Sequence, residues 1–216
     1  YIRKLARKIL NSNKGRRNIL LIAIALTSIL FTSLFSVVLG LEKSMEVQTM
    51  KSIGTISHGS FKEVSDSDIE VLSKDKDIKE YSIRKKVGIL DDEKIMAELS
   101  YTDENGFEWA MLDNVQGKFP EKENETFIDL GTAKKLGYKG EIGEEIEIPY
   151  NIEKPYTGEI IEKKSGIFII SGTYQSPIDS NVSVGQIYLS KAYVEKLKLS
   201  EKSNDMEVMF KNSWQI

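Results

Sequence analysis

The stretch "NSNKGRRNILLIAIALTSILFTSLFSVVLGLEKSMEVQ", residues 11–48, determines how the rest of the chain is organised. Within it, the segment from Ile19 to Leu41 contains 23 residues and no charge. A helix of that length is about 35 Å long, and a bilayer's hydrocarbon core is only about 30 Å thick. The sequence therefore predicts a helix that crosses a membrane.

Two other interpretations fit the segment less well. A cleaved signal peptide has an apolar core of only about 7–15 residues and then a small-residue cleavage site, whereas the continuation here is "LEKSME". A core helix of a soluble protein would show a polar face. The only polar side chains in the segment are hydroxyls, which can bond to their own helix backbone: Thr27, Ser28, Thr32, Ser33 and Ser36. A permanent membrane span is favoured.

The charges on either side of the span predict its orientation. Seven basic residues and no acidic residue precede it: Arg3, Lys4, Arg7, Lys8, Lys14, Arg16 and Arg17. The positive-inside rule places this end in the cytoplasm and residues 42–216 outside. The whole chain carries −3 and the first 41 residues carry +7, so the remainder carries −10. Such an acidic exterior argues against nucleic acid as a partner.

The segment before the span has its own periodicity. Apolar residues recur at helical spacing, and basic residues take the other face; the apolar set is Ile2, Leu5, Ala6, Ile9 and Leu10. Residues 1–17 are therefore expected to be a cytoplasmic, basic amphipathic segment. Its first ten residues form a helix that lies on anionic membrane lipid, and a short turn from Asn11 to Gly15 precedes the span.

The helix is expected to continue beyond the membrane. Residues 42–53 contain neither Gly nor Pro, and Gly54 is the first plausible stop. We therefore expect one helix over residues 18–53, which forms both the span and a stalk. Val47, Met50 and Ile53 lie on a loose apolar stripe of the stalk, where a partner helix could pack.

Residues 54–216 are long enough for one extracytoplasmic domain with a sizeable core. The chain has no Cys, which excludes disulfides and thiolate metal sites, and its single His58 is expected to be structural or on the surface. No P-loop, G-x-S-x-G elbow or H-E-x-x-H motif is present, and the acidic clusters fit a solvated surface. No catalytic, cofactor-binding or metal-binding residue is predicted.

Strand and helix patterns alternate along this domain. The expected strands are residues 55–64, 78–90, 94–103, 127–130, 144–150, 157–175, 186–189 and 206–210. The expected helices are short: one follows Ser65 as N-cap, one covers residues 132–136, and one runs from Ser190 to Leu197; residues 107–115 are a helix or a loop. This mixture predicts an α+β domain.

One stretch of the domain resembles a known protein family: residues 117–148, "GKFPEKENETFIDLGTAKKLGYKGEIGEEIEI". Their Gly-x-x-Pro, Asn-Glu, Leu-Gly and Ile-Gly-Glu elements resemble the extracytoplasmic core domain of FtsX-like, MacB-like ABC-transporter permeases. "GIFIISGTYQSP" and "VGQIYLSKAYVEKL" resemble later segments of that domain, and the apolar run resembles the family's first transmembrane helix. The motif residues are expected to build the fold rather than an active site: Gly117, Pro120, Asn124, Glu125, Gly137 and Gly143.

The resemblance implies partners. Permeases of this type have further spans, work with a separate ATPase that binds the ATP, and pair with a second permease copy or half. The stalk residues Val47, Met50 and Ile53 would then couple ATP hydrolysis to motions of the extracytoplasmic domain. The chain would then be an N-terminal fragment of a non-catalytic subunit, with the core domain at 54–216 truncated at its C-terminal end. It would export or extract peptide, lipid-linked or hydrophobic substrates, or relay a signal. The alternative is a single-span, membrane-anchored sensor or binding module.

Overall fold

The computed structural model describes residues 3–4, 14–155, 157–176 and 184–211. The chain divides into two units, residues 1–49 and residues 50–216. Most of the expected amphipathic helix over residues 1–17 lies outside the described residues, although Arg3 and Lys4 are helical. That expectation stays a prediction.

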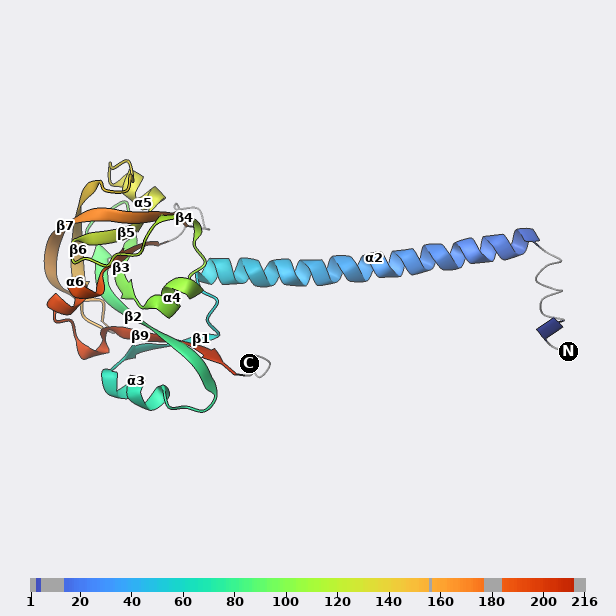
Figure 1. Ribbon diagram of the computed structural model, residues 1–216, viewed down its shortest axis with the longest axis horizontal. Coiled ribbons are helices and arrows are strands. Elements are labelled where there is room, and N and C mark those ends of the chain that lie inside the picture. The colour runs from blue at the N-terminus through green and yellow to red at the C-terminus, as the bar shows by residue number, and fades with distance from the viewer. Residues whose placement is uncertain (1–2, 5–13, 156, 177–183, 212–216) are drawn as a thin grey trace. The chain divides into compact units, whose positions relative to one another are not determined.

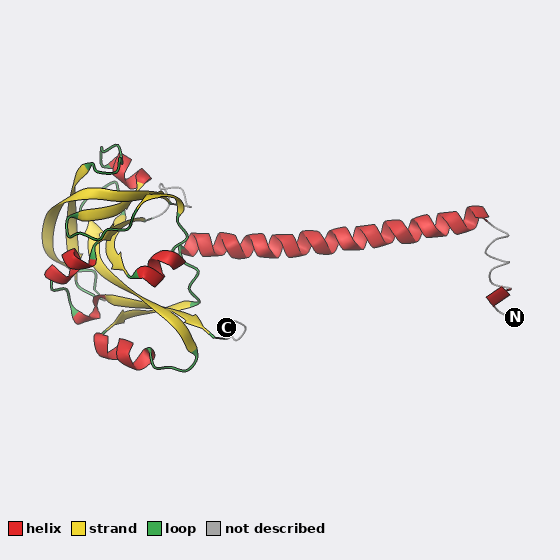
Figure 2. Ribbon diagram, viewed as in Figure 1, coloured by secondary structure: helices red, strands yellow, loops and turns green. Residues whose placement is uncertain are grey.

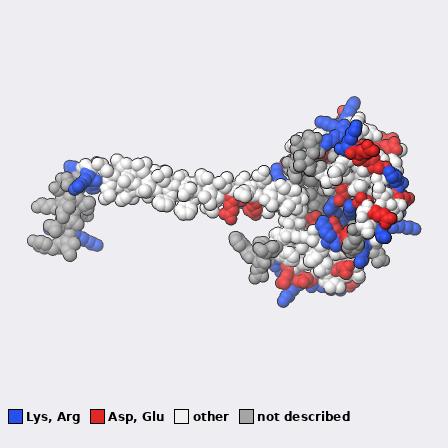
Figure 3. Space-filling model, turned by 180° about the vertical axis from the view of Figure 1, so that it is seen from behind, with Lys and Arg blue, Asp and Glu red and all other residues white. Residues whose placement is uncertain are grey.

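A single helix, α2 (Lys14–Ile53), includes both the apolar run and the stalk segment. It is long and apolar enough to cross a membrane by length and composition. Two of its hydroxyls bond back to the preceding turn, Thr27 to the Ala23 carbonyl at 2.6 Å and Thr32 to the Ser28 carbonyl at 2.8 Å. Figure 3 shows its long uncharged surface, with basic residues at the N-terminal end. The expected helix over residues 18–53 is confirmed at its C-terminal end.

The described helix already includes residues before the expected boundary at residue 18. Lys14 and Gly15 are helical, so the expected turn from Asn11 to Gly15 does not include them. A Gly costs only about 1 kcal/mol in a helix, and a long apolar helix extends readily into neighbouring residues. At the other end Gly54 has φ +86° and donates its N–H to the Met50 carbonyl at 2.8 Å, as a helix stop requires.

The second unit is an α+β domain, as expected (Figures 1 and 2). Its strands are β1 (Gly59–Val64), β2 (Ile78–Leu90), β3 (Ala97–Thr102), β4 (Asp113–Gly117), β5 (Glu125–Asp129), β6 (Glu145–Glu153), β7 (Ile160–Gln175), β8 (Gly185–Leu189) and β9 (Asn204–Phe210). Its helices are α3 (Asp66–Leu72), α4 (Glu104–Trp109), α5 (Leu130–Lys135), α6 (Lys191–Lys196) and the 3₁₀ turn η1 (Glu201–Ser203).

Six strands close on themselves into a small barrel. The sheet runs β2-β3-β8-β5-β7, and β6 pairs with both β7 and β2, which returns the pairing to its start. The longest pairing is the hairpin of β6 and β7, with register from Glu145 opposite Ile169 to Glu153 opposite Ile160. A closed barrel leaves no free edges among these strands, and β4 is added outside it along β7.

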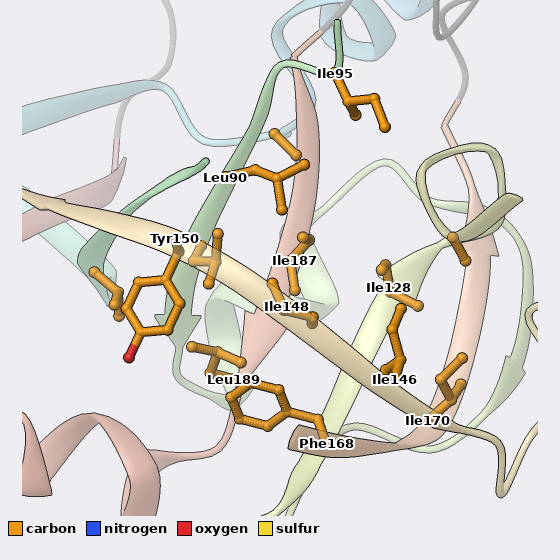
Figure 4. Packing of buried hydrophobic residues seen from close by; sticks show 14 of the residues in the cluster. Leu90, Ile95, Ile128, Ile146, Ile148, Tyr150, Phe168, Ile170, Ile187 and Leu189 are labelled. Carbon is orange, nitrogen blue, oxygen red and sulfur yellow. The ribbon is translucent and has the colours of Figure 1, made fainter. Parts of the chain in front are cut away.

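The inward-facing side chains of the barrel form the main hydrophobic core. Figure 4 shows aliphatic residues from several strands converging around Tyr150 and Phe168. Fully buried members include Leu99, Ile128, Ile146, Ile148, Ile170, Ile187 and Leu189. In β6 the buried residues Ile146 and Ile148 alternate with exposed ones, as in a sheet with one covered face, whereas β5 is buried at every position.

Closure of the barrel depends on Gly88 in β2. A Cβ at this position would lie 1.9 Å from the carbonyl oxygen of Asn151 in β6. A backbone atom cannot move away as the end of a flexible side chain can, so only Gly allows β2 and β6 to approach. The register of β2 against β3 also shifts between Lys86 and Gly88, where the strand turns into the barrel wall.

The first half of β2 lies in a three-stranded part of the same sheet outside the barrel, called the small sheet below. There the order is β1-β9-β2, and β9 pairs antiparallel with both neighbours. A separate core lies beneath α3 and contains Val64, Ile78, Met206 and Val208. Helix α3 begins with the expected cap, since Ser65 accepts from the Asp68 N–H and Asp68 bonds back to Ser65.

Several boundaries differ from those expected from the sequence. The first strand starts at Gly59 instead of residue 55, and Thr55 makes only an isolated bridge to Ala110. The segment over residues 107–115 contains both the end of α4 and the start of β4, a strand that was not predicted. The strand expected over 144–150 continues to Glu153, because the β7 hairpin partner supplies bonds beyond the local pattern.

Candidate functional site

The residues of the family-like motif, from Gly117 to Gly143, lie in or beside loops of the domain. Gly117 ends β4 with φ +76°, and a Cβ there would lie 2.4 Å from the Ser171 carbonyl oxygen. Pro120 is buried, and the Asn124 carbonyl accepts from the Ile169 N–H at 2.7 Å. Gly137 and Gly143 have φ values of +92° and +91°, so both need the left-handed conformation that Gly allows. A structural role fits these five residues.

Glu125 also acts in the fold. It opens β5 as expected and is buried, and its Oε2 accepts the backbone N–H groups of Glu121 and Lys122, each at 3.0 Å. These bonds, above all the one from Lys122, hold the pKa of the Glu125 carboxyl below its ordinary value. The carboxylate therefore fastens the loop before β5.

The Ile-Gly-Glu motif fastens a second loop in the same way. The Glu144 carboxylate accepts the N–H groups of Lys139 at 3.2 Å, Gly140 at 2.8 Å and Glu141 at 3.2 Å. These backbone bonds, with Lys139 the largest contributor, lower the pKa of Glu144. Neither motif carboxylate is placed for chemistry on a ligand.

The stalk residues lie at the end of α2. Val47 and Ile53 are exposed and Met50 is half-buried. The last turn, Met50–Ile53, is tied into the second unit: Lys51 Nζ contacts both Asp113 oxygens at 3.0 Å, and the Gly54 carbonyl accepts from the Met111 N–H at 3.1 Å. The role of these residues in coupling stays a prediction.

A charged cavity lies where the small sheet meets the barrel. It has a volume of about 340 Å³, within the range of small-ligand pockets. Its walls come from β1, β2, β3, η1, β9 and the turn between β6 and β7. The charged residues that line it are Lys62, Glu63, Arg84, Lys86, Glu98, Glu153, Lys154, Lys202 and Asp205.

The more deeply placed charges of the cavity are mainly acidic. The side chains of Asp205, Glu153 and Glu98 are 11%, 16% and 17% exposed, and that of Arg84 is 19% exposed. Arg84 is ion-paired with Glu98 and lies 3.7 Å from Asp205. The cavity floor therefore contains three carboxylates and one guanidinium, which is paired with two of them, Glu98 and Asp205.

Lysine side chains reach this floor from the rim. Lys62 Nζ lies 2.9 Å from Asp205 Oδ2, and Lys86 Nζ lies 2.9 Å from Glu153 Oε2. These lysines are 57% and 42% exposed. Their ammonium groups therefore extend from solvent into contact with largely buried carboxylates.

A β-bulge in β1 shapes one wall of the cavity. The register of β1 against β9 shifts between Phe61 and Val64, and Glu63 has φ +54°, which is uncommon for a residue with a side chain. In this conformation the Glu63 N–H donates to Asp205 Oδ1 at 3.1 Å while Lys62 reaches Oδ2. Both oxygens of Asp205 are thus held in a fixed orientation.

Arg84 also borders a second, smaller cavity of about 110 Å³. That cavity is lined by the residues that follow α2, including Gly54 and Thr55, and by Glu207. Thr55 Oγ1 donates to Glu207 Oε2 at 2.9 Å. One guanidinium therefore lies against the charged cavity and against the segment in which α2 ends.

The sequence did not single out the cavity, because its residues come from separate segments and each looks like a solvated charge. No local pattern marked them, because Arg84 and Lys86 stand in a strand that also carries Lys79, Glu80 and Lys85. Among the described residues, no group of three or more His, Cys, Asp or Glu side chains could hold a metal ion. His58 has a structural role, since its Nδ1 accepts the Phe210 N–H at 3.0 Å.

Comparisons with known proteins give similarities of fold. No protein-family model matches the chain, and no curated protein matches it significantly. The extracellular domain of the noncanonic ABC-type transporter YknZ from Gram-positive bacteria is 15% identical with a TM-score of 0.47, over 73% of this chain and 76% of that chain. The periplasmic region of MacB from Actinobacillus actinomycetemcomitans is 16% identical with a TM-score of 0.42, over 69% of this chain and 66% of that chain. Neither similarity bears on substrates or partners.

Proposed function

We propose that the chain is the N-terminal part of an ABC-transporter permease subunit, with a first transmembrane helix and an extracytoplasmic core domain. In this proposal residues 1–17 are cytoplasmic and residues 42–216 are outside. A separate ATPase subunit binds and hydrolyses ATP, and this chain is not an enzyme. The transported material is a peptide, a lipid-linked molecule or a hydrophobic compound.

The observation that supports this proposal most is the end of α2. The helix is continuous from Lys14 to Ile53, and its last turn, which belongs to the second unit, is held within that unit by the bonds of Lys51 and Gly54. A helix that only anchors a domain to the membrane does not need to continue without a break into that domain. A helix that transmits movement does need to be continuous, because movement passes through turns that are hydrogen-bonded to one another.

Co-purification from the cells that make the protein tests the proposal. An affinity tag inserted after Thr157, in the turn between β6 and β7, leaves both strands intact. The expected result is that an ATP-hydrolysing subunit accompanies the chain from mild detergent. If the tagged chain is fully recovered from membranes and no ATPase activity accompanies it, the permease proposal is wrong.

The charged cavity favours a second candidate, a membrane-anchored sensor or binding module. A pocket of about 340 Å³ with buried, ordered charges is what a domain that detects a small ligand requires. The same purification separates the candidates, since a sensor module would be recovered without an ATPase. Its ligand binding is measured on the untagged chain, because Lys154, Pro155 and Gly158 of the tagged turn line the cavity.

A further inference from the structure

We propose that the charged cavity between the small sheet and the barrel binds a ligand that carries a primary ammonium or guanidinium group, such as the basic side chains of a peptide. In the described structure two of the chain's own lysines occupy the positions of that group. The inference goes beyond the permease proposal and does not depend on it, because binding can be measured without an ATPase.

The distribution of buried and exposed charges in the cavity indicates the sign of the charge on its ligand. Asp205, Glu153 and Glu98 lie deeper than the lysines that neutralise them. An anionic group that reached the inner part of the cavity would approach these three carboxylates, where Arg84 is the one similarly buried cation; Lys154 and Lys202, which also line the cavity, are exposed. A cationic group would meet the carboxylate oxygens that Lys62 and Lys86 contact.

Lys62 and Lys86 show that an ammonium group fits these acceptors. Each places its Nζ 2.9 Å from a floor carboxylate, the distance of a charge-assisted hydrogen bond. Ion pairs of such exposed lysines contribute little, so a competing ammonium displaces them at small cost. A long lysine side chain that leaves its carboxylate can extend into water and regain hydration there.

The remaining floor contacts keep the carboxylates in place when a lysine leaves. Asp205 Oδ1 still accepts the Glu63 N–H from the bulge at 3.1 Å. Arg84 remains against Glu98 and donates to Gln186 Oε1 at 3.4 Å. The site is therefore prepared for exchange of its outer cations while its inner bonds persist.

Isothermal titration calorimetry of the full chain in detergent tests this inference, with trilysine as the probe and triglutamate as the comparison. Trilysine should bind, and triglutamate should not. Lys62→Met removes the internal competitor at Asp205, so it should tighten trilysine binding about two- to five-fold. Glu153→Gln removes an acceptor and should weaken binding by a similar factor.

Lys74→Met is the matched control. Lys74 is paired with Glu70 on α3, away from the cavity residues, and its loss should leave trilysine binding unchanged. The inference is overturned if the wild type does not bind trilysine, or if Lys62→Met binds trilysine more weakly than the wild type does. It is also overturned if triglutamate binds more tightly than trilysine, a result that would assign the cavity to anions. If Glu153→Gln does not fold, Lys62→Met still decides, because its predicted effect has the opposite sign.

Discussion

The replacement Glu125→Gln tests the role assigned to the family motif. The carboxylate is buried and accepts two backbone N–H groups, from Glu121 and Lys122. The Gln amide oxygen can accept the same bonds, but without the charge each is about half as strong. Two bonds weakened by roughly 0.5–1 kcal/mol each give a loss of about 1–2 kcal/mol in the free energy of unfolding.

The expected loss has a definite dependence on pH. The folded-state pKa of Glu125 lies below its ordinary value of 4.5, so its stabilisation is fully present above that value. It is lost as the pH falls through the lowered folded-state pKa. The difference in stability between wild type and Glu125→Gln should therefore be constant near pH 7 and should shrink toward zero under acid conditions below the folded-state pKa.

Thermal unfolding of the full chain in detergent measures this difference. Near-ultraviolet circular dichroism reports the domain rather than α2, because the aromatic cluster of Phe107, Phe119, Phe127, Tyr174 and Tyr188 lies in the barrel wall. A loss of 1–2 kcal/mol corresponds to a fall of about 2–8 °C in Tm for a domain of this size.

Glu121→Gln is the control for the same loop. Its side chain is 73% exposed and pairs only with Lys118, at 3.3 Å, so its Tm should change by less than about 2 °C. The reasoning is refuted if Glu125→Gln unfolds at the wild-type temperature near pH 7, or if its deficit persists unchanged at acid pH.

Three further predictions concern closure, caps and topology. Gly88→Ala should destabilise the domain by at least about 3 kcal/mol in chemical denaturation, because its Cβ would meet the Asn151 backbone. Gly59→Ala is the control in the same assay and should be tolerated, since the nearest atom to its Cβ would be 4.0 Å away. Ser190→Ala should cost about 1 kcal/mol, since the Ser190 hydroxyl accepts the Tyr193 N–H that opens α6; an unchanged denaturant midpoint would contradict the cap. The chain has no Cys, so a single Cys at Thr157 should react in intact cells with a membrane-impermeant maleimide and one at Ser12 should not; the reverse pattern would invert the topology.

Local signals in the sequence were sufficient for much of the fold. The apolar run, and the absence of Gly and Pro from residues 42–53, predicted α2 and its end at Gly54. The caps at Ser65 and Ser190 were read correctly because a hydroxyl that accepts the third N–H of a helix acts within one turn of chain.

Non-local features were beyond those signals. Strand β4, "DNVQG", is polar and lies at the edge of the sheet, so no alternation marks it. Closure of the barrel depends on β2 meeting β6, strands more than 50 residues apart, and no local pattern specifies that pairing. The charged cavity is a consequence of the same closure, since Arg84, Glu153 and Asp205 come together only after the strands have paired.

The central claim is that α2 carries movement between the membrane and the exterior domain, and one measurement tests it most directly. A fluorophore on a single Cys at Thr157, in the complex with its ATPase, reports whether the domain responds to ATP. The helix is then interrupted by replacing Val47-Gln48-Thr49 with Gly-Gly-Pro, where the Pro alone costs about 3 kcal/mol in a helix interior. Ala-Ala-Ala at the same positions keeps the helix and serves as the control. The account predicts an ATP-dependent change of the signal in the wild type and the Ala variant, and none in the Gly-Gly-Pro variant although ATP is still hydrolysed. An equal response in all three would contradict it, and α2 would then be only a tether.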